Sequence, residues 1–143
     1  FLSELITTMQ GLDHIAVAVP DMEQAIADWQ RLTGAKLTHR EHVASQHTHV
    51  AFLQIGDFRI ELLAGDSPDA NVSKFVEKRG PGLHHLAIKS LDGQQTLTEL
   101  AQAGAKLINE TLRPGAENTL VGFVHPSSFG GVLVEVVEHP KHG

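Results

Sequence analysis

The 143-residue sequence contains no cysteine, and this absence excludes disulfide bonds and metal sites built from thiolates. It also has no apolar run near the roughly 18 residues that would predict a membrane-spanning helix. Its first ten residues lack the basic opening and the long apolar stretch of a secretory signal. We therefore expect a cytoplasmic protein, and we interpret Met9 as the native start, with residues 1–8 as additional sequence.

Positive charge is also scarce, because 11 Lys and Arg stand against 17 Asp and Glu, a formal net charge of -6. This balance disfavours a protein that binds nucleic acid through bulk charge. The hydrophobic content of 41% is ordinary for a globular protein, and the length suffices for one compact domain. These features predict neither a nucleic-acid partner nor a membrane partner.

What the chain does contain is an internal repeat. Residues 13–62 and 84–136 share one layout: a short apolar strand that begins with histidine, a helix, and later strands with Val-Ala-Phe or Val-Gly-Phe and then Ile-Glu-Leu or Val-Glu-Val. Gly-Ala-Lys-Leu at 34–37 recurs at 104–107, a shift of 70 residues. Sequence landmarks that recur in the same order, at nearly the same offset between the two copies, predict a duplicated module.

Each copy is predicted to be a βαβββ module, and one such module cannot bury both faces of its sheet, so two should pair in an α+β fold. In the first copy Asp21 and Gly34 are expected to cap the helix, and in the second Asp92 is the expected N-cap. The predicted strands are 12–19, 36–42, 48–55 and 58–63, then 83–88, 105–111, 119–125 and 131–137. The predicted single domain is 11–143, with modules 11–65 and 82–138, a linker helix in 66–81 and an N-terminal extension at 1–10.

The repeat places one histidine near the start and one glutamate near the end of each module. His14 and His85 lie 71 residues apart, and Glu61 and Glu135 lie 74 apart. Strand alternation puts the branched aliphatic residues on the opposite face, so these four side chains are predicted to point into one cavity.

Two imidazoles and two carboxylates suit a divalent first-row metal ion. Without an ion, the two glutamates would repel each other and lie desolvated. The alternative is that each is an isolated polar residue on a partly open sheet, but four such residues at duplicated positions favour the metal site.

The chain has ten histidines, and most of them cannot be ligands. His84 is expected to face the helix layer or a subunit contact, and His125 to lie near the mouth of the cavity. Several others are expected at the surface or an interface, although His47 and His49 share a face and resemble a chance metal site. These surface histidines are His39, His42, His47 and His49, with His139 and His142 in the tail.

Several stretches resemble the vicinal oxygen chelate (glyoxalase/bleomycin resistance/dioxygenase) superfamily and, within it, the methylmalonyl-CoA epimerases. They are Leu12-Asp13-His14-Ile15-Ala16, Ile60-Glu61-Leu62-Leu63, Gly82-Leu83-His84-His85, and Phe123-Val124-His125-Pro126 leading into Val134-Glu135. The likeness covers roughly residues 11–140.

The resemblance implies a U-shaped eight-stranded mixed sheet around a metal trough, with His14, Glu61, His85 and Glu135 as ligands of Co, Mn, Ni, Zn or Fe. It also implies a homodimer and an acyl-CoA substrate. The implied activity is epimerisation of methylmalonyl-CoA, or of a related 2-substituted acyl-CoA, by proton abstraction through a metal-stabilised enediolate. Glu135 and Glu61 are the candidate catalytic residues.

Two positions depart from the epimerases. Val50 stands where some of them carry a further glutamate, and Ser127 where they usually carry lysine. Alternatives of the same superfamily are a glyoxalase-I-type lactoylglutathione lyase, which shares the metal set, and a metal-free ligand-binding protein. A metal-dependent extradiol dioxygenase is less favoured, since such relatives commonly use one carboxylate and two histidines.

Overall fold

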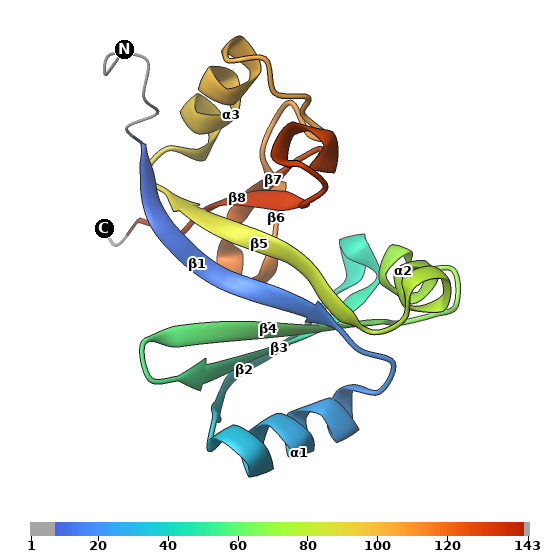
Figure 1. Ribbon diagram of the computed structural model, residues 1–143. Helices are drawn as coiled ribbons and strands as arrows, with labels where there is room; N and C mark the ends of the chain where they lie inside the picture. Colours follow the sequence, from blue (N-terminus) through green and yellow to red (C-terminus); the bar gives the residue numbers. More distant parts are fainter. Residues whose placement is uncertain (1–7, 142–143) are drawn as a thin grey trace. The chain divides into compact units, whose positions relative to one another are not determined.

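The computed structural model describes residues 8–141 and contains three α-helices and eight strands within that range (Figure 1). The chain divides into two compact units. One is His14–His84, and the other combines the described residues up to Asp13 with those from His85 onward. No helix in residues 8–141 is both long and apolar enough to span a membrane.

The His14–His84 unit is a four-stranded sheet in the order β2-β3-β4-β1, with two helices. Strand β1 pairs with β4 in parallel, whereas β2–β3 and β3–β4 are antiparallel. The elements are β1 (Met9–Ala18), which enters this unit at His14, α1 (Met22–Thr33), β2 (Lys36–Val43), β3 (Thr48–Ile55), β4 (Phe58–Gly65) and α2 (Asn71–Arg79).

Helix α1 begins and ends at the predicted residues. The Asp21 side chain accepts a hydrogen bond from the Gln24 backbone at 3.1 Å, and Gly34 closes the helix at φ 71°, a left-handed conformation that glycine adopts without strain. The helix buries Ile26 in a core with residues of the sheet that include Leu53 and Leu62. The opposite face of this sheet is therefore left for other side chains.

The second unit has strands in the order β5-β8-β7-β6, and β5 pairs with β8 in parallel. Asp92 caps its helix by accepting from the Gln95 backbone at 3.0 Å, as predicted. The elements are β5 (Gly82–Ser90), α3 (Gly93–Gln102), β6 (Arg113–Pro114), β7 (Leu120–Val124) and β8 (Val134–Glu138). The predicted class, an α+β fold of two βαβββ modules with an eight-stranded mixed sheet, is confirmed.

The predicted strand at 105–111 is wrong. That stretch holds only an isolated bridge between Leu107 and Val124, and β6 is two residues long. Backbone bonds to β7 remain, because the Ile108 backbone donates to the Phe123 carbonyl and the His125 backbone donates to the Lys106 carbonyl, both at 2.8 Å. Side chains take part as well: the Phe123 backbone donates to Asn109 Oδ1 at 2.9 Å, and the Leu112 backbone donates to Gln94 Oε1 at 3.2 Å. Strand alternation in a sequence does not reveal such side-chain contacts.

The contact between α3 and β7 depends on the absence of a side chain at Gly122. A Cβ atom there would lie 2.7 Å from Cδ1 of Leu97, which is fully buried. We expect Gly122→Ala to lower the free energy of unfolding by about 1–3 kcal/mol, the usual cost of overpacking. In a Leu97→Ala background, the same substitution should cost almost nothing. Urea unfolding of the four proteins measures this coupling, and an equal cost in both backgrounds would contradict it.

Candidate metal centre

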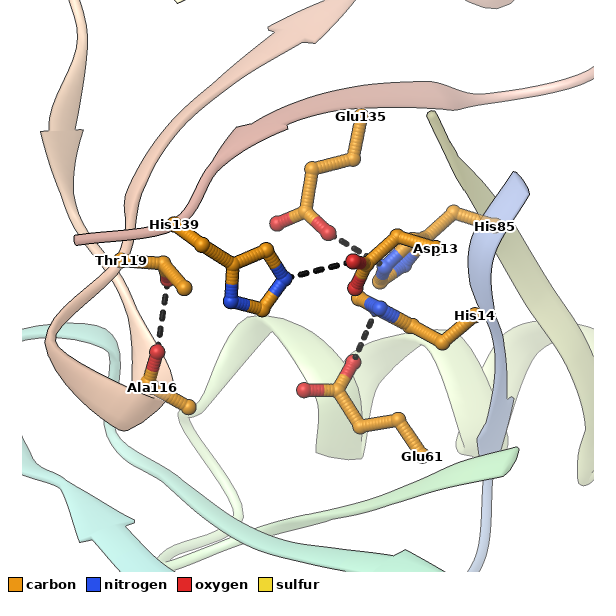
Figure 2. Close-up of polar contacts among 8 residues, drawn as sticks. All are labelled: Asp13, His14, Glu61, His85, Ala116, Thr119, Glu135 and His139. Carbon is orange, nitrogen blue, oxygen red and sulfur yellow. Dashed lines mark hydrogen bonds and ion pairs between the residues drawn. The ribbon is translucent and has the colours of Figure 1, made fainter. Parts of the chain in front are cut away.

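The first half of the candidate site lies where β1 runs beside β4. The register pairs Ala16 with Glu61, and His14 precedes Ala16 by two residues on the same face of the strand. His14 Nε2 lies 3.2 Å from Glu61 Oε1, and the two residues are only 4% and 7% exposed (Figure 2). The structure therefore brings these two predicted ligands together.

The second half repeats this arrangement between β5 and β8. Here Ala87 pairs with Glu135, and His85 precedes Ala87 by two residues. His85 Nε2 lies 3.2 Å from Glu135 Oε1, with exposures of 6% and 8% (Figure 2). Strand pairing, spacing and ligand-atom distance are thus the same in both modules.

Each His–Glu pair has one aromatic neighbour that the sequence reasoning did not assign to the site. Phe52, on β3, lies opposite Glu61 and meets the His14 ring edge-on, with ring centroids 5.3 Å apart. Phe123, on β7, lies opposite Glu135 and meets the His85 ring edge-on, with ring centroids 5.2 Å apart. The signal was available in the repeated Val-Ala-Phe and Val-Gly-Phe, which the sequence reasoning used only as landmarks of the repeat.

The geometry of each pair fits a bound divalent ion. When two donor atoms bind the same ion, each at about 2.1 Å, and the donor–ion–donor angle is roughly 100°, the two donors lie about 3.2 Å apart. That is the separation found in both pairs. Neutral imidazole and carboxylate are a common donor set for first-row metals, and an ion would balance carboxylates that burial otherwise destabilises.

Asp13 and His139 form a further contact that the sequence reasoning missed. His139 Nε2 and Asp13 Oδ1 are 2.5 Å apart, and the Asp13 side chain is buried (Figure 2). Asp13 immediately precedes His14, so this contact fixes the backbone beside a candidate ligand by binding the C-terminal tail to β1. The other tail histidine, His142, lies outside the described residues.

The remaining histidines lie mostly where they were predicted. His42, His47 and His49 are exposed or half-exposed near the β2–β3 connection, and His42 Nε2 lies 2.8 Å from Asp66 Oδ2. The hydrogen bond from His42 and the nearby charge of His47 lower the pKa of Asp66 below its ordinary value.

Two further predictions concerned His84 and His125. The His84 ring lies 4.7 Å from the Phe75 ring at an interplanar angle of 58°, so His84 contacts the linker helix α2. His125 caps a short 3-10 helix, where its Nδ1 accepts a hydrogen bond from the Ser127 backbone at 3.0 Å.

Two βαβββ modules, each with a buried His–Glu pair at equivalent positions, define the vicinal oxygen chelate class of protein. The chain belongs to the Glyoxalase/Bleomycin resistance protein/Dioxygenase superfamily, whose family model matches residues 13–123. The prediction of an epimerase-like enzyme within this superfamily is confirmed by the relatives that follow.

The chain is 32% identical over 127 residues to the ethylmalonyl-CoA/methylmalonyl-CoA epimerase of Cereibacter sphaeroides, covering 87% of this chain and 95% of that one. Its fold matches the crystal structure of methylmalonyl-CoA epimerase from Mycobacterium tuberculosis with a TM-score of 0.90, at 35% identity, over 96% and 93% of the two chains. A Streptomyces coelicolor methylmalonyl-CoA epimerase variant in complex with 2-nitronate-propionyl-CoA matches with a TM-score of 0.88, at 26% identity, over 92% and 95%.

Proposed function

We propose that this protein epimerises methylmalonyl-CoA or a related 2-substituted acyl-CoA. The observation that carries the proposal is the exact repetition of a buried His–Glu pair, with the same 3.2 Å separation, in both modules. The similarity to epimerases, one of them bound to an acyl-CoA analogue, supports the choice of substrate.

We infer that His14, Glu61, His85 and Glu135 together bind one divalent ion, which we expect to be Co, Mn, Ni, Zn or Fe. Such an ion supplies positive charge that polarises the substrate carbonyl oxygens and so makes the proton between them more acidic. The two imidazoles would position it as neutral donors, while the two carboxylates offset its charge.

The glutamates have a second proposed role, which is to move the substrate proton. The α-carbon of methylmalonyl-CoA lies between two carbonyl groups, so a carboxylate within hydrogen-bonding reach is a sufficient base. Glu135 and Glu61 are our candidates, because both carboxylates are buried beside a histidine. Phe52 and Phe123 contact the rings of those histidines edge-on and so help to hold them in position.

We further propose that the protein acts in the cytoplasm as a homodimer and that residues 11–143 form one catalytic domain. The superfamily resemblance supports the dimer, and the absence of cysteine agrees with a reducing compartment.

The test is solvent exchange at the α-carbon. We expect metal-loaded protein in D2O to exchange deuterium into both epimers of methylmalonyl-CoA and to interconvert them, as followed by mass spectrometry and chiral analysis. The same preparation should not turn over the hemithioacetal of glutathione and methylglyoxal. The reverse result would replace the epimerase with the lyase, and protein that binds acyl-CoA without metal and without exchange would be a binding protein.

A further inference from the structure

We infer that His42, His47 and Asp66 form a second divalent-metal site, separate from the candidate metal centre and suited to a late first-row ion such as Zn²⁺ or Ni²⁺. All three residues belong to the His14–His84 unit. His42 lies on β2, His47 follows a short 3-10 helix in the β2–β3 connection, and Asp66 is the residue after β4. None of them takes part in the proposed epimerisation, so this inference does not rest on it.

The two histidines converge on one carboxylate oxygen. His42 Nε2 lies 2.8 Å from Asp66 Oδ2, and His47 Nδ1 lies 3.7 Å from the same atom. Two donors that bind one ion at about 2.1 Å with a tetrahedral angle lie about 3.4 Å apart. Both observed separations are therefore close to those of donors that share an ion. Imidazole suits Zn, Ni and Cu, and a carboxylate completes an N/O donor set for these ions.

Asp66 is the fixed member of the cluster. Its side chain is only 18% exposed, and its backbone N–H donates to the His47 carbonyl at 2.9 Å. The hydrogen bond from His42, together with the nearby charge of His47, holds the pKa of Asp66 below its ordinary value. The carboxylate is therefore ionised at neutral pH and can bind a cation.

The backbone of His47 has a conformation that few residues other than glycine adopt. Its φ of 51° and ψ of 42° are left-handed, and its N–H donates to the Ala44 carbonyl at 3.1 Å. Such residues carry strain, and they concentrate at functional positions. Glycine would avoid that strain, so a binding role for the imidazole accounts for a histidine at this position.

The strand register separates this site from the candidate metal centre. His42 is directly opposite His49 of β3, and their rings lie 4.5 Å apart, so a third imidazole lies beside the site. His49 in turn pairs with Ala64 of β4, whereas Phe52 pairs with Glu61. Residues an odd number of positions apart on a strand project to opposite faces. His42 and His49 are thus on the face opposite Glu61.

Rotation of two exposed rings would close the site around an ion. The side chains of His42 and His47 are 47% and 70% exposed, so packing in the core does not fix either of them. The bound ion would replace the hydrogen bond between His42 and Asp66 with one bond to each, and it would link β2, the β2–β3 connection and the end of β4. With three ligands, two of them exposed, this site should bind more weakly than the candidate metal centre and add little to the Tm at concentrations that fill that centre.

His39 and Glu41 provide a matched control on the same strand. His39 Nε2 lies 2.8 Å from Glu41 Oε1, and the two side chains are 34% and 33% exposed. His39→Gln therefore removes a histidine–carboxylate contact of the same length from β2 and leaves His42 and Asp66 in place.

The experiment counts the Zn²⁺ ions bound by untagged, full-length protein in equilibrium dialysis. We expect two ions per chain in the parent and one in the double variant Glu61→Gln with Glu135→Gln, which keeps the site inferred here. Adding Asp66→Asn or His47→Gly to the double variant should weaken the remaining binding by at least about 10–100-fold, which is the usual cost of losing even an outer partner of a metal ligand. Adding His39→Gln instead should leave the Kd unchanged.

Proton NMR with Ni²⁺ identifies the ligands directly, because the paramagnetic ion should broaden the ring signals of His42 and His47 before that of His39. A double variant that binds no ion would overturn this inference and leave the proposed function standing. Equal weakening by His39→Gln, or no weakening by both Asp66→Asn and His47→Gly, would also overturn it. A parent that binds one ion, lost in Asp66→Asn but kept in the double variant, would support this site and contradict the candidate metal centre.

Discussion

Replacing Glu135 with alanine is expected to lower kcat/KM for methylmalonyl-CoA by at least about 10³-fold, because it removes a metal ligand and a proton-transfer group together. The loss should persist at saturating metal concentration. Glu135 lies on β8, whose backbone pairs with β5 and β7 on its two sides independently of this side chain, so we expect the far-UV circular dichroism spectrum to be retained. Steady-state kinetics with elemental analysis of the same sample is the measurement.

Two further variants separate the parts of this effect. Glu135→Gln keeps the shape of the side chain and removes its charge, so it should be as inactive as Glu135→Ala while packing like the parent. Glu77→Ala changes an exposed glutamate of α2 and should leave the rate unchanged. Full activity of Glu135→Ala would refute the assignment of this residue.

Removal of the metal is expected to destabilise the protein strongly. Glu61 and Glu135 are almost completely buried, so without an ion their charges would lie desolvated. Returning an ion at about 1,000 times its Kd would stabilise the fold by about 4 kcal/mol. For a chain of this length, that corresponds to a rise in Tm on the order of 10 °C.

The measurement is calorimetry of chelator-treated protein before and after addition of Co, Mn, Ni, Zn or Fe. A double variant, Glu61→Gln with Glu135→Gln, is the control: its metal-free form should melt higher than that of the parent, and metal should raise its Tm little. Identical melting of parent protein with and without metal, with the metal content verified, would contradict a shared ion held by the four residues.

The sequence predicted the two modules and the repeated His and Glu positions because both follow a simple period. Alternation along a strand predicts the face of the sheet on which each side chain lies. Duplication indicates which positions carry the same residue type in both modules. His14 and Glu61 were found in this way, and so were His85 and Glu135. The structure places each pair at contact distance.

Prediction from the sequence failed where the local structure depends on contacts between distant residues. These contacts are pairing between strands and hydrogen bonds from the backbone to a side chain. The stretch before β6 is bonded through the side chains of Asn109 and Gln94, whose backbone partners lie 14 and 18 positions away in the sequence. The contact between Asp13 and His139 joins residues 126 positions apart. Nothing in either local sequence indicates these partners, because each is selected by the packing of the whole unit.

By itself, the sequence determined the module type, the helix caps and the chemical identity of the two His–Glu pairs, because these follow from local geometry and repetition. Only the tertiary structure decided which residues lie beside those pairs. Register across β2, β3 and β4 brings His39 opposite Phe52 and Glu41 opposite Val50, on the face that carries His14 and Glu61. That register is fixed by long-range hydrogen bonding and core packing, which a periodic pattern along one strand does not contain.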